Sequence, residues 1–400
     1  MAAKFGKGVI GGFVIVCVLL GFFVGANAAA GGTKIIKLGA IVPLTGPAAT
    51  WGQWGLRMQE NFEKWYNAKG GITVKGQKYT VEAVGVDDKF TLIGGRAAAE
   101  KFFYVDKGDF IVASFSVEAI SGWAPLSTKE KKLAVIGAPS WHPRPEAPYV
   151  FRVVCSDGER STALCSLMKD KFGAKSVLYM FTDDIMGKSD SETARKDEKK
   201  RGLEVKGYLL VPPNTQDFYP FLTKELKKKP DYIHSTLPPG STALVVKQAR
   251  ELGFKGSIGC PTSMPGDLKK WQGIAGGVEA SKGYIAGLAT RDEWSPLGLG
   301  YYDLWRKSYP DQEVSDLAYT MQAHVLMLAI EKAQSFDPDD ILKVLRTAEF
   351  HSFHKYPVKA GTGGEKTFGI KNHMTVPYCF SRITGENQTE YLGSYQEFTP

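Results

Sequence analysis

The order of apolar and polar positions predicts strands that alternate with helices along most of the chain. Residues 35–42 are a mostly apolar run that stops at Pro43, as expected of a buried parallel strand. Large apolar side chains then recur at helical spacing between Trp51 and Trp65, and this pattern ends at the glycines of residues 67–71. A buried strand followed by an amphipathic helix is the unit that the rest of the chain repeats.

Two series of such units follow one another. The first series predicts strands at 79–86, 110–113, 133–137 and 149–154, with helices at 95–105 and 118–130. The second predicts strands at 176–181, 203–211, 231–236 and 257–260, again with helices between them. Strands separated by helices of this length form parallel sheets through right-handed βαβ units. We therefore predict an α/β fold with two lobes, divided near residues 155–157.

The last third of the chain departs from this rhythm. An apolar run at 283–288 precedes three predicted helices at 297–308, 315–333 and 338–347. The tail from 351 to 398 is rich in glycine and has strand-like pieces such as 374–383.

The first thirty residues are typical of an export signal. Lys4 and Lys7 precede an uncharged run at 9–24, and small residues in an A-x-A arrangement follow at 25–30. The run is shorter than the ~20 apolar residues of a usual transmembrane helix. We expect residues 1–30 to be cleaved, which lowers the formal net charge from +8 to +6. Retention of this segment as an anchor is the alternative.

Composition and charge exclude several classes of protein. Apolar residues make up 43% of the chain and charged residues 23%, which is ordinary globular composition rather than that of a disordered or fibrous chain. Short basic clusters lie at predicted helix ends, where they favour the helix dipole, at 129–132, 199–201 and 227–229. Aromatic residues do not alternate with these clusters, so we expect no nucleic-acid partner.

The cysteines and histidines give no firm metal or disulfide signature. Beyond the signal, the cysteines are Cys155, Cys165, Cys260 and Cys379, which allow three pairings and include no C-x-x-C motif. Disulfides and buried free thiols are both compatible with this pattern. The spacing of His351 and His354, with His373 further on, suits one helical turn, but the surroundings are typical of loop and strand. We predict no metal site.

Motifs of common catalytic chemistry are absent. The sequence has no phosphate-binding loop, dinucleotide turn, nucleophile elbow or H-E-x-x-H motif. The first strand-to-helix turn, residues 43–47, offers no nucleophile or base. We therefore expect neither an enzyme nor a cofactor; a secreted α/β hydrolase would need a Ser/His/Asp arrangement that the sequence does not show.

The loops that follow the strands hold the candidate ligand-binding residues. In open α/β sheets, ligands bind at the carboxyl ends of strands, where helix N-termini present free amides. The first lobe offers Trp51, Ser114, Phe115, Ser116, Glu118, Ala138, Ser140 and Trp141, and the second offers Asp183, Asp184, Met186, Pro238 and Thr262. Two such lobes form a cleft that closes on a small molecule by hinge motion.

Several of these candidates have a structural alternative. Ser116 is equally suited to capping the N-terminus of a helix, which is the commoner role of a loop serine, and the same choice applies to Ser140. Trp51 begins a helix whose later aromatic residues are expected in the core, while Phe115 and Trp141 are compatible with packing at a hinge or rim.

Six segments together resemble a known family. They are residues 39–47, 51–52, 67–72, 87–88, 217–218 and 247–250. In combination the sequence resembles the branched-chain amino-acid-binding proteins of ABC transporters, in the type I periplasmic-binding-protein superfamily. The resemblance implies two Rossmann-like lobes joined by a three-strand hinge and no catalysis. It places 33–154 with 285–349 in the N-terminal lobe and 155–284 with 350–400 in the C-terminal lobe.

The same resemblance assigns roles to the candidates. Ser114 and Ser116 are nearest to the Ser/Thr-rich loop that holds the ligand carboxylate, and Trp51 stands where the family often has Tyr. Ala138 and Ser140 match the next loop. In the second lobe, Met186 replaces a tyrosine, a further tyrosine is expected near Pro238, and Thr262 replaces the acidic residue that holds the ammonium of the ligand.

The threonine at position 262, where the family has an acidic residue, affects which ligand we expect. A buried ammonium without a countercharge costs several kcal/mol, which argues against an α-amino acid. We favour an apolar or aromatic body with a carboxylate or amide end. Glu118, Asp183 or Asp184 are alternative sources of negative charge, so branched-chain and other amino acids stay open.

Together these expectations describe a solute-binding protein of an ABC importer. The resemblance implies a periplasmic, monomeric protein that delivers a small molecule to an inner-membrane permease. A ligand-sensing ectodomain on a retained anchor is the alternative.

Overall fold

The computed structural model describes residues 32–46, 48–263, 268–287, 294–310, 318–360, 369–376 and 378–394. The predicted signal, residues 1–30, lies outside the described residues. The described fold belongs to the unit Thr33–Pro400. Within the described ranges, every helix is too short or too polar to span a membrane.

The first sheet has seven strands in the order β14-β6-β5-β4-β1-β3-β2. They are β1 (Lys34–Val42), β2 (Ile72–Val74), β3 (Gln77–Asp87), β4 (Phe110–Val112), β5 (Ala134–Ile136), β6 (Val150–Val153) and β14 (His373–Met374). All neighbouring pairs are parallel except β2 with β3, which form an antiparallel hairpin at one edge. The long apolar strand β1 therefore lies inside the sheet, as its sequence predicts.

The second sheet also has seven strands, in the order β16-β15-β11-β10-β9-β7-β8. They are β7 (Ser176–Thr182), β8 (Glu204–Val211), β9 (Tyr232–Ser235), β10 (Ser257–Ser263), β11 (Ile285–Gly287), β15 (Cys379–Gly385) and β16 (Gln388–Ser394). The strands from β8 to β11 are parallel, whereas β15 and β16 pair in antiparallel fashion. Strands β12 (Glu349–Phe350) and β13 (Val358–Lys359) form a separate two-stranded sheet.

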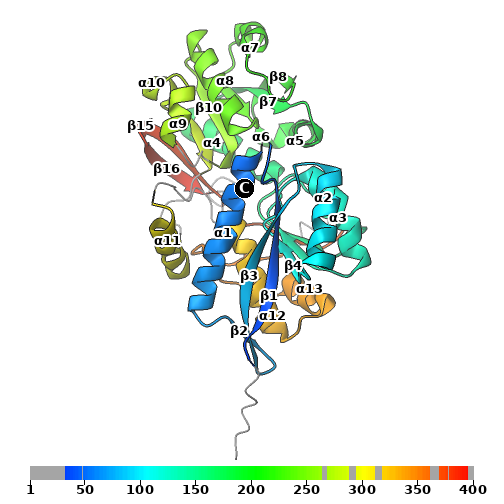
Figure 1. Cartoon of the computed structure of the whole chain (residues 1–400). Coiled ribbons are helices and arrows are strands. Elements are labelled where there is room, and N and C mark those ends of the chain that lie inside the picture. The colour runs from blue at the N-terminus through cyan, green and yellow to red at the C-terminus, as the bar shows by residue number, and fades with distance from the viewer. Residues whose placement is uncertain are drawn as a thin grey trace, which may run out of the picture. The chain divides into compact units, whose positions relative to one another are not determined.

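Helices fill the connections between the strands (Figure 1). Those of the first half are α1 (Ala49–Ala68), α2 (Leu92–Glu100) with a π-helical extension (Lys101–Val105), α3 (Val117–Lys129), α4 (Asp157–Phe172), α5 (Ile185–Lys196) and α6 (Glu198–Arg201). The second half has α7 (Tyr219–Glu225) with a 3₁₀ turn (Leu226–Lys228), α8 (Pro239–Glu251), α9 (Leu268–Ile274), α10 (Val278–Ser281), α11 (Pro296–Ser308), α12 (Ala318–Ala333) and α13 (Pro338–Thr347). The predicted alternation of strand and helix is confirmed.

The described strands show how the chain passes between the two sheets. It leaves the first sheet after β6, returns to it at β14 after β11, and leaves again to form β15, so three connections run between the sheets. The largest apolar cluster includes residues of both sheets, among them Phe151 of β6 and Tyr179 of β7. Separate clusters cover the other face of the first sheet, around Trp123, and of the second, around Ile233.

The predicted lobe boundaries stay a prediction, to which the sheets add two facts. Strand β11, at the start of the 285–349 segment, belongs to the second sheet. Strand β14, in the tail, pairs in parallel with β6 of the first sheet.

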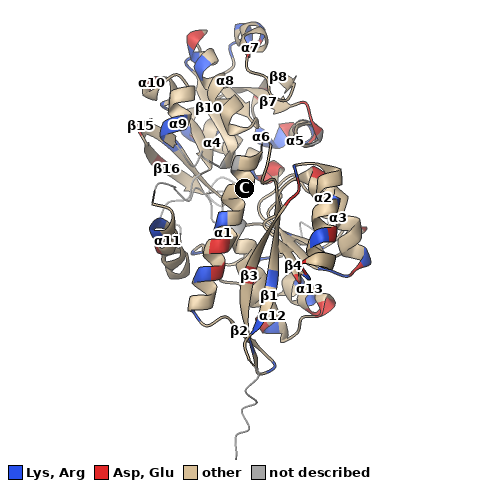
Figure 2. Cartoon of the chain, in the orientation of Figure 1, with Lys and Arg blue, Asp and Glu red and all other residues tan. Residues whose placement is uncertain are grey.

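The structure bears on two questions that the sequence left open: whether the cysteines form disulfides and how the charged residues are distributed. Cys155, Cys165, Cys260 and Cys379 are buried free cysteines, so the structure contains no disulfide between them. Lysine, arginine, aspartate and glutamate are interspersed on the helices of both sheets (Figure 2). In this view the basic residues are not gathered on one face.

The close packing of α2 on α3 gives a test of the first lobe. A Cβ added to Gly95 of α2 would overlap the backbone of Ala119 in α3. We expect Gly95→Ala to force the helices apart and to lower the free energy of unfolding by about 2 kcal/mol, measured by urea denaturation. Gly240→Ala in α8 is the control, because nothing lies within 4 Å of its added Cβ. This helical substitution should be neutral or stabilising by up to about 1 kcal/mol. Equal effects of the two changes would contradict the close contact.

Candidate ligand-binding site

Ser114 lies at the carboxyl end of β4, beside the loop that follows β5. The backbone N–H of Gly137 donates to the carbonyl of Ser114 at 3.2 Å, which joins the two loops. Ser114 is fully buried, and its hydroxyl has no hydrogen-bond partner among the described residues. Ala113, just before it, has φ of 56°, a left-handed conformation that costs a residue with a side chain about 1 kcal/mol or more. Buried strain beside an unsatisfied hydroxyl is typical of a binding site.

Ser116 caps helix α3. Its Oγ accepts the backbone N–H of Ala119 at 3.1 Å and donates to Glu118 Oε2 at 3.4 Å. The capping role that the sequence left as an alternative is thus present. Burial raises the pKa of Glu118, and the negative charge of Asp184 raises it further. Two candidates from different sheets, Glu118 and Asp184, therefore lie within electrostatic range of each other.

The apolar candidates of the first sheet differ in their surroundings. Trp51, in the first turn of α1, is half-buried, as is Phe115, which packs against a small cluster with Ala113. Ala138 and Trp141 are buried in the core cluster on one face of the first sheet. The guanidinium carbon of Arg144 lies 4.1 Å from the centroid of the Trp141 ring. Trp51 and Phe115 thus keep exposed surface for a ligand, while Trp141 is 2% exposed.

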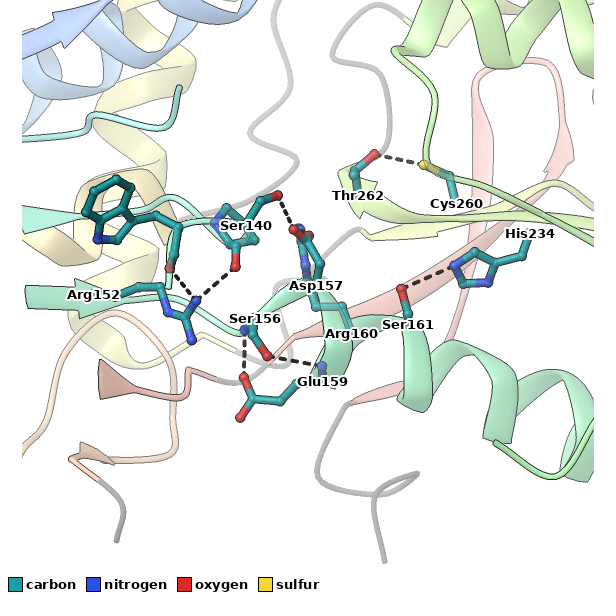
Figure 3. Close-up of polar contacts among 12 residues, drawn as sticks. Ser140, Arg152, Ser156, Asp157, Glu159, Arg160, Ser161, His234, Cys260 and Thr262 are labelled. Carbon is teal, nitrogen blue, oxygen red and sulfur yellow. Dashed lines mark hydrogen bonds and ion pairs between the residues drawn. The ribbon is translucent and has the colours of Figure 1, made fainter. Parts of the chain in front are cut away.

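Ser140 connects the first sheet to helix α4. Its hydroxyl donates to Oδ2 of Asp157, the first residue of α4, and the guanidinium of Arg160 pairs with Oδ1 of the same carboxylate (Figure 3). Asp157 and Arg160 are 8% and 5% exposed. Although burial acts in the opposite direction, Arg160 and Ser140 hold the pKa of Asp157 below its ordinary value. Sequence reasoning missed both charged residues; the available signal was an acidic first turn directly after a crossover strand.

The N-terminal turns of α4 are held by a helix cap, by residues of the C-terminal tail and by a strand of the second sheet. Ser156 caps the helix and forms a capping box with Glu159. Glu159 also accepts the hydroxyl of Thr375 at 2.7 Å and lies 3.4 Å from Nε2 of His373. Burial opposes ionisation of Glu159, but His373, Thr375 and the Ser156 N–H together lower its pKa to about 2. One turn later, Ser161 Oγ lies 3.2 Å from His234 Nε2 of β9, so α4 contacts both sheets.

His373 and the other histidines considered for a metal do not meet. His351 is exposed, His354 lies in a bridge with Trp294, and His373 contacts Arg152 and Glu159. Within the described ranges, no group of three or more metal-ligating side chains comes together.

The candidates of the second sheet lie at the N-termini of α5 and α8 and at the end of β10. Asp184 caps α5 by accepting the N–H of Gly187 at 2.7 Å, whereas the exposed Asp183 pairs with Lys188 at 2.9 Å. The other candidates of this sheet, Met186, Pro238 and Thr262, are half-buried. The Thr262 hydroxyl lies 2.8 Å from Cys260 Sγ (Figure 3). Thr182, the last residue of β7, has a buried hydroxyl with no partner in the described part of the chain.

Asp87 is the last residue of β3 and Asp88 follows it, and the pKa values of the two carboxyl groups are shifted in opposite directions. Asp87 accepts the N–H of Leu44 at 2.8 Å and the hydroxyl of Thr45 at 2.6 Å, and these bonds lower its pKa although burial opposes them. Asp88 is fully buried, and only its Oδ1 has a hydrogen-bond partner among the described residues, the N–H of Phe90. Burial, helped by the charges of Asp87 and Glu118, raises the pKa of Asp88 from 3.8 to about 7.

The opposite pKa shifts of Asp87 and Asp88 predict opposite effects on stability when each residue is replaced by asparagine. Because the pKa of Asp88 is higher in the folded chain, its protonated form supports folding, and that support is lost as pH rises from about 4 to about 7. Asp88→Asn keeps the uncharged form, so we expect it to raise the free energy of unfolding at pH 8 by roughly 2–4 kcal/mol and much less at pH 5. Asp87→Asn should destabilise at both pH values. Urea denaturation at the two pH values measures both; an Asp88→Asn effect independent of pH would contradict the assignment.

The chain has two α/β lobes with mainly parallel sheets, and comparison with known proteins shows which class of protein has this fold. Residues 35–388 match the sequence model of the Periplasmic binding protein family, so the chain belongs to that family. The family and the fold are those of non-enzymatic solute-binding proteins.

One curated relative is a Leu/Ile/Val-binding protein homolog 6 of Brucella melitensis. It is 28% identical over 248 residues, which cover 60% of this chain and 60% of that relative. The match thus spans less than two thirds of the relative's length.

Solved structures share the fold at low sequence identity. A leucine-binding protein of Thermotoga maritima superposes with a TM-score of 0.72 at 21% identity, covering 90% of this chain and 98% of that one. A solute-binding protein of an ABC transporter from R. palustris, in complex with 4-hydroxybenzoate, gives 0.73 at 20% identity, with 90% and 97% covered. A branched-chain amino-acid transporter substrate-binding protein of Streptococcus pneumoniae, in complex with isoleucine, gives 0.70 at 18% identity, with 90% and 99% covered. The predicted type I periplasmic-binding-protein fold is confirmed.

Proposed function

We propose that this protein captures a small organic molecule at the carboxyl ends of its two sheets and delivers it to an ABC import permease in the inner membrane. Membership of the periplasmic binding protein family over residues 35–388 supports this function. The observation that carries the site is Ser114, whose buried hydroxyl lacks a partner in the described structure at the end of β4. A buried hydroxyl of this kind favours a ligand that supplies the missing hydrogen bond.

The ligand we propose is an amino acid or an aromatic or aliphatic carboxylate. Trp51, Phe115 and Met186 offer half-buried apolar surface for the body of such a molecule. The N-termini of α3 and α5 offer backbone amides for its polar end. Related structures hold isoleucine in one case and 4-hydroxybenzoate in another, so both classes belong in the test.

We propose a periplasmic location, with residues 1–30 removed as a signal and the mature chain acting as a monomer. Sequencing of the mature N-terminus tests this: a start near Ala29 supports export by cleavage, and an intact N-terminus favours the anchored sensor instead.

A thermal-shift screen tests the binding function. We expect leucine, isoleucine and valine, or benzoate, 4-hydroxybenzoate and aliphatic acids, to raise the Tm of the protein. A ligand at 100 times its Kd stabilises the folded state by about 2.7 kcal/mol, which is several degrees for a chain of this kind. Calorimetry then measures the Kd of each hit. Absence of stabilisation by every member of the panel would contradict the proposed ligand classes.

Substitution of two nearby serines distinguishes an effect on ligand binding from an effect on folding. Ser114→Ala breaks no hydrogen bond of the described structure, so we expect unchanged or higher stability and an affinity about tenfold lower for the ligand found in the screen. Ser116→Ala removes the cap of α3 and should lower the free energy of unfolding by about 1 kcal/mol. Calorimetry and urea denaturation on both variants make the comparison. Unchanged affinity in Ser114→Ala would exclude this hydroxyl from the site.

A further inference from the structure

One carboxylate joins the two sheets at the first connection between them. The hydroxyl of Ser140, in the loop after β5, donates to Oδ2 of Asp157, and the guanidinium of Arg160 pairs with Oδ1 (Figure 3). All three residues are buried. Asp157 and Arg160 belong to α4, which packs against β10 of the second sheet. The carboxylate thus binds a loop of the first sheet with one oxygen and a side chain of α4 with the other.

Each end of this link is held in its own half of the molecule. Arg152 of β6 donates to the backbone carbonyls of Pro139 and Trp141, the two residues that flank Ser140. On the other side, α4 contacts both β9 and β10 of the second sheet. The link therefore connects two packed bodies and does not merely tie a loop to its neighbour.

The other two connections between the sheets meet the same part of α4. The guanidinium carbon of Arg160 lies 5.2 Å from the ring centroid of Tyr378, just before β15. A Cβ added to Gly287, the last residue of β11, would overlap the Tyr378 hydroxyl, so the second connection begins against this ring. The hydroxyl of Thr375, in the third connection, donates to Glu159 at 2.7 Å. All three connections thus converge on the first turns of α4.

Helix capping does not account for the partners of Asp157. Ser156 and Glu159 already form the capping box of α4. An acidic residue in a first turn also stabilises the helix dipole, but that effect needs no partner in another element. The bond from Ser140 therefore serves the contact between the sheets.

We propose that Asp157 is a positioning residue that fixes the spacing of the two lobes by holding Ser140 and Arg160 on one carboxylate. Candidate ligand residues lie on both lobes, for example Ser114 after β4 and Met186 in α5. A ligand that contacts both lobes binds more tightly when they are already held at the right spacing, because less motion is lost on binding. This inference rests on the proposed function and adds a residue that controls affinity without touching the ligand.

Hydrogen–deuterium exchange of the mature protein without added ligand tests the proposal. Ser140→Ala removes the donor and leaves the pair of Asp157 with Arg160 intact. A hydrogen bond to a charged group stabilises enough to slow local opening about tenfold or more, so we expect amides of residues 137–141 and 150–157 to exchange about tenfold faster. Amides within β1 and β9 should keep their wild-type rates. Ser140→Thr retains the hydroxyl and should restore slow exchange.

Ser127→Ala is the matched control. Ser127 is also buried, and its hydroxyl donates to the carbonyl of Lys132, within the first lobe and away from the connections. We expect a lower free energy of unfolding and wild-type exchange at 150–157. Equal acceleration in this control would assign the effect to a general loss of stability and would overturn the inference.

Gly287→Ala disturbs the same cluster from the opposite end. The added Cβ has to displace the Tyr378 ring, which lies against Arg160. We expect faster exchange at 150–157, as in Ser140→Ala. Because Gly287 is not a candidate ligand residue, a shared effect of the two variants shows a role in lobe spacing that direct contact of Ser140 with a ligand would not produce.

Calorimetry with leucine and with 4-hydroxybenzoate completes the test. For whichever of the two binds the wild type, we expect both variants to lower the affinity about threefold to tenfold. Wild-type exchange in both variants, or unchanged affinity in Gly287→Ala despite faster exchange, would overturn the inference and leave the proposed function intact. Failure of the wild type to bind any amino acid or organic acid would instead overturn the proposed function, because the exchange measurement needs no ligand.

Discussion

The fully buried side chain of Arg152 holds together the parts of the molecule on which the candidate site depends. From β6 its guanidinium donates to the carbonyls of Pro139 at 2.9 Å and Trp141 at 2.6 Å, and Nε donates to His373 Nδ1 of β14 at 3.1 Å. Burial lowers its pKa to about 10, so it stays charged at neutral pH. Loss of this side chain would leave buried carbonyls unpaired in the loop that presents Ser140.

Most of the fold could be predicted from the sequence because its strands and helices have clear, different periods. The uninterrupted apolar run at 35–42 became β1, and the helical stripe that begins near Trp51 became α1. The antiparallel edges were missed. Strand β2 is only three residues long, and it exists because β3 continues beyond its predicted start to pair with it. Such strands are stabilised by a neighbour in space, which a local pattern does not reveal.

The sequence predicts candidate site residues one by one, but it does not predict the contacts among them. Ser114 and Ser140 could be predicted because they follow strands, and the carboxyl ends of parallel strands lie together at one edge of a sheet. Asp157 was not predicted because it lies in a helix, and only the folded chain brings the first turn of α4 to the Ser140 hydroxyl and pairs its carboxylate with Arg160. Ser116 shows the converse: its residue type fits both a ligand contact and a helix cap, and the backbone geometry of α3 decides that it caps.

The free thiols have a consequence for how motion in this protein can be followed. Cys155 donates to the carbonyl of Val376 at 2.7 Å, at the connection between the sheets, while Cys165 lies 3.4 Å from the Tyr179 hydroxyl inside the second lobe. All four described cysteines are buried and unlinked, so a thiol reagent reaches each one only when its own surroundings open. The chain thus carries native reporters of hinge and lobe fluctuations, and needs no introduced label to compare them.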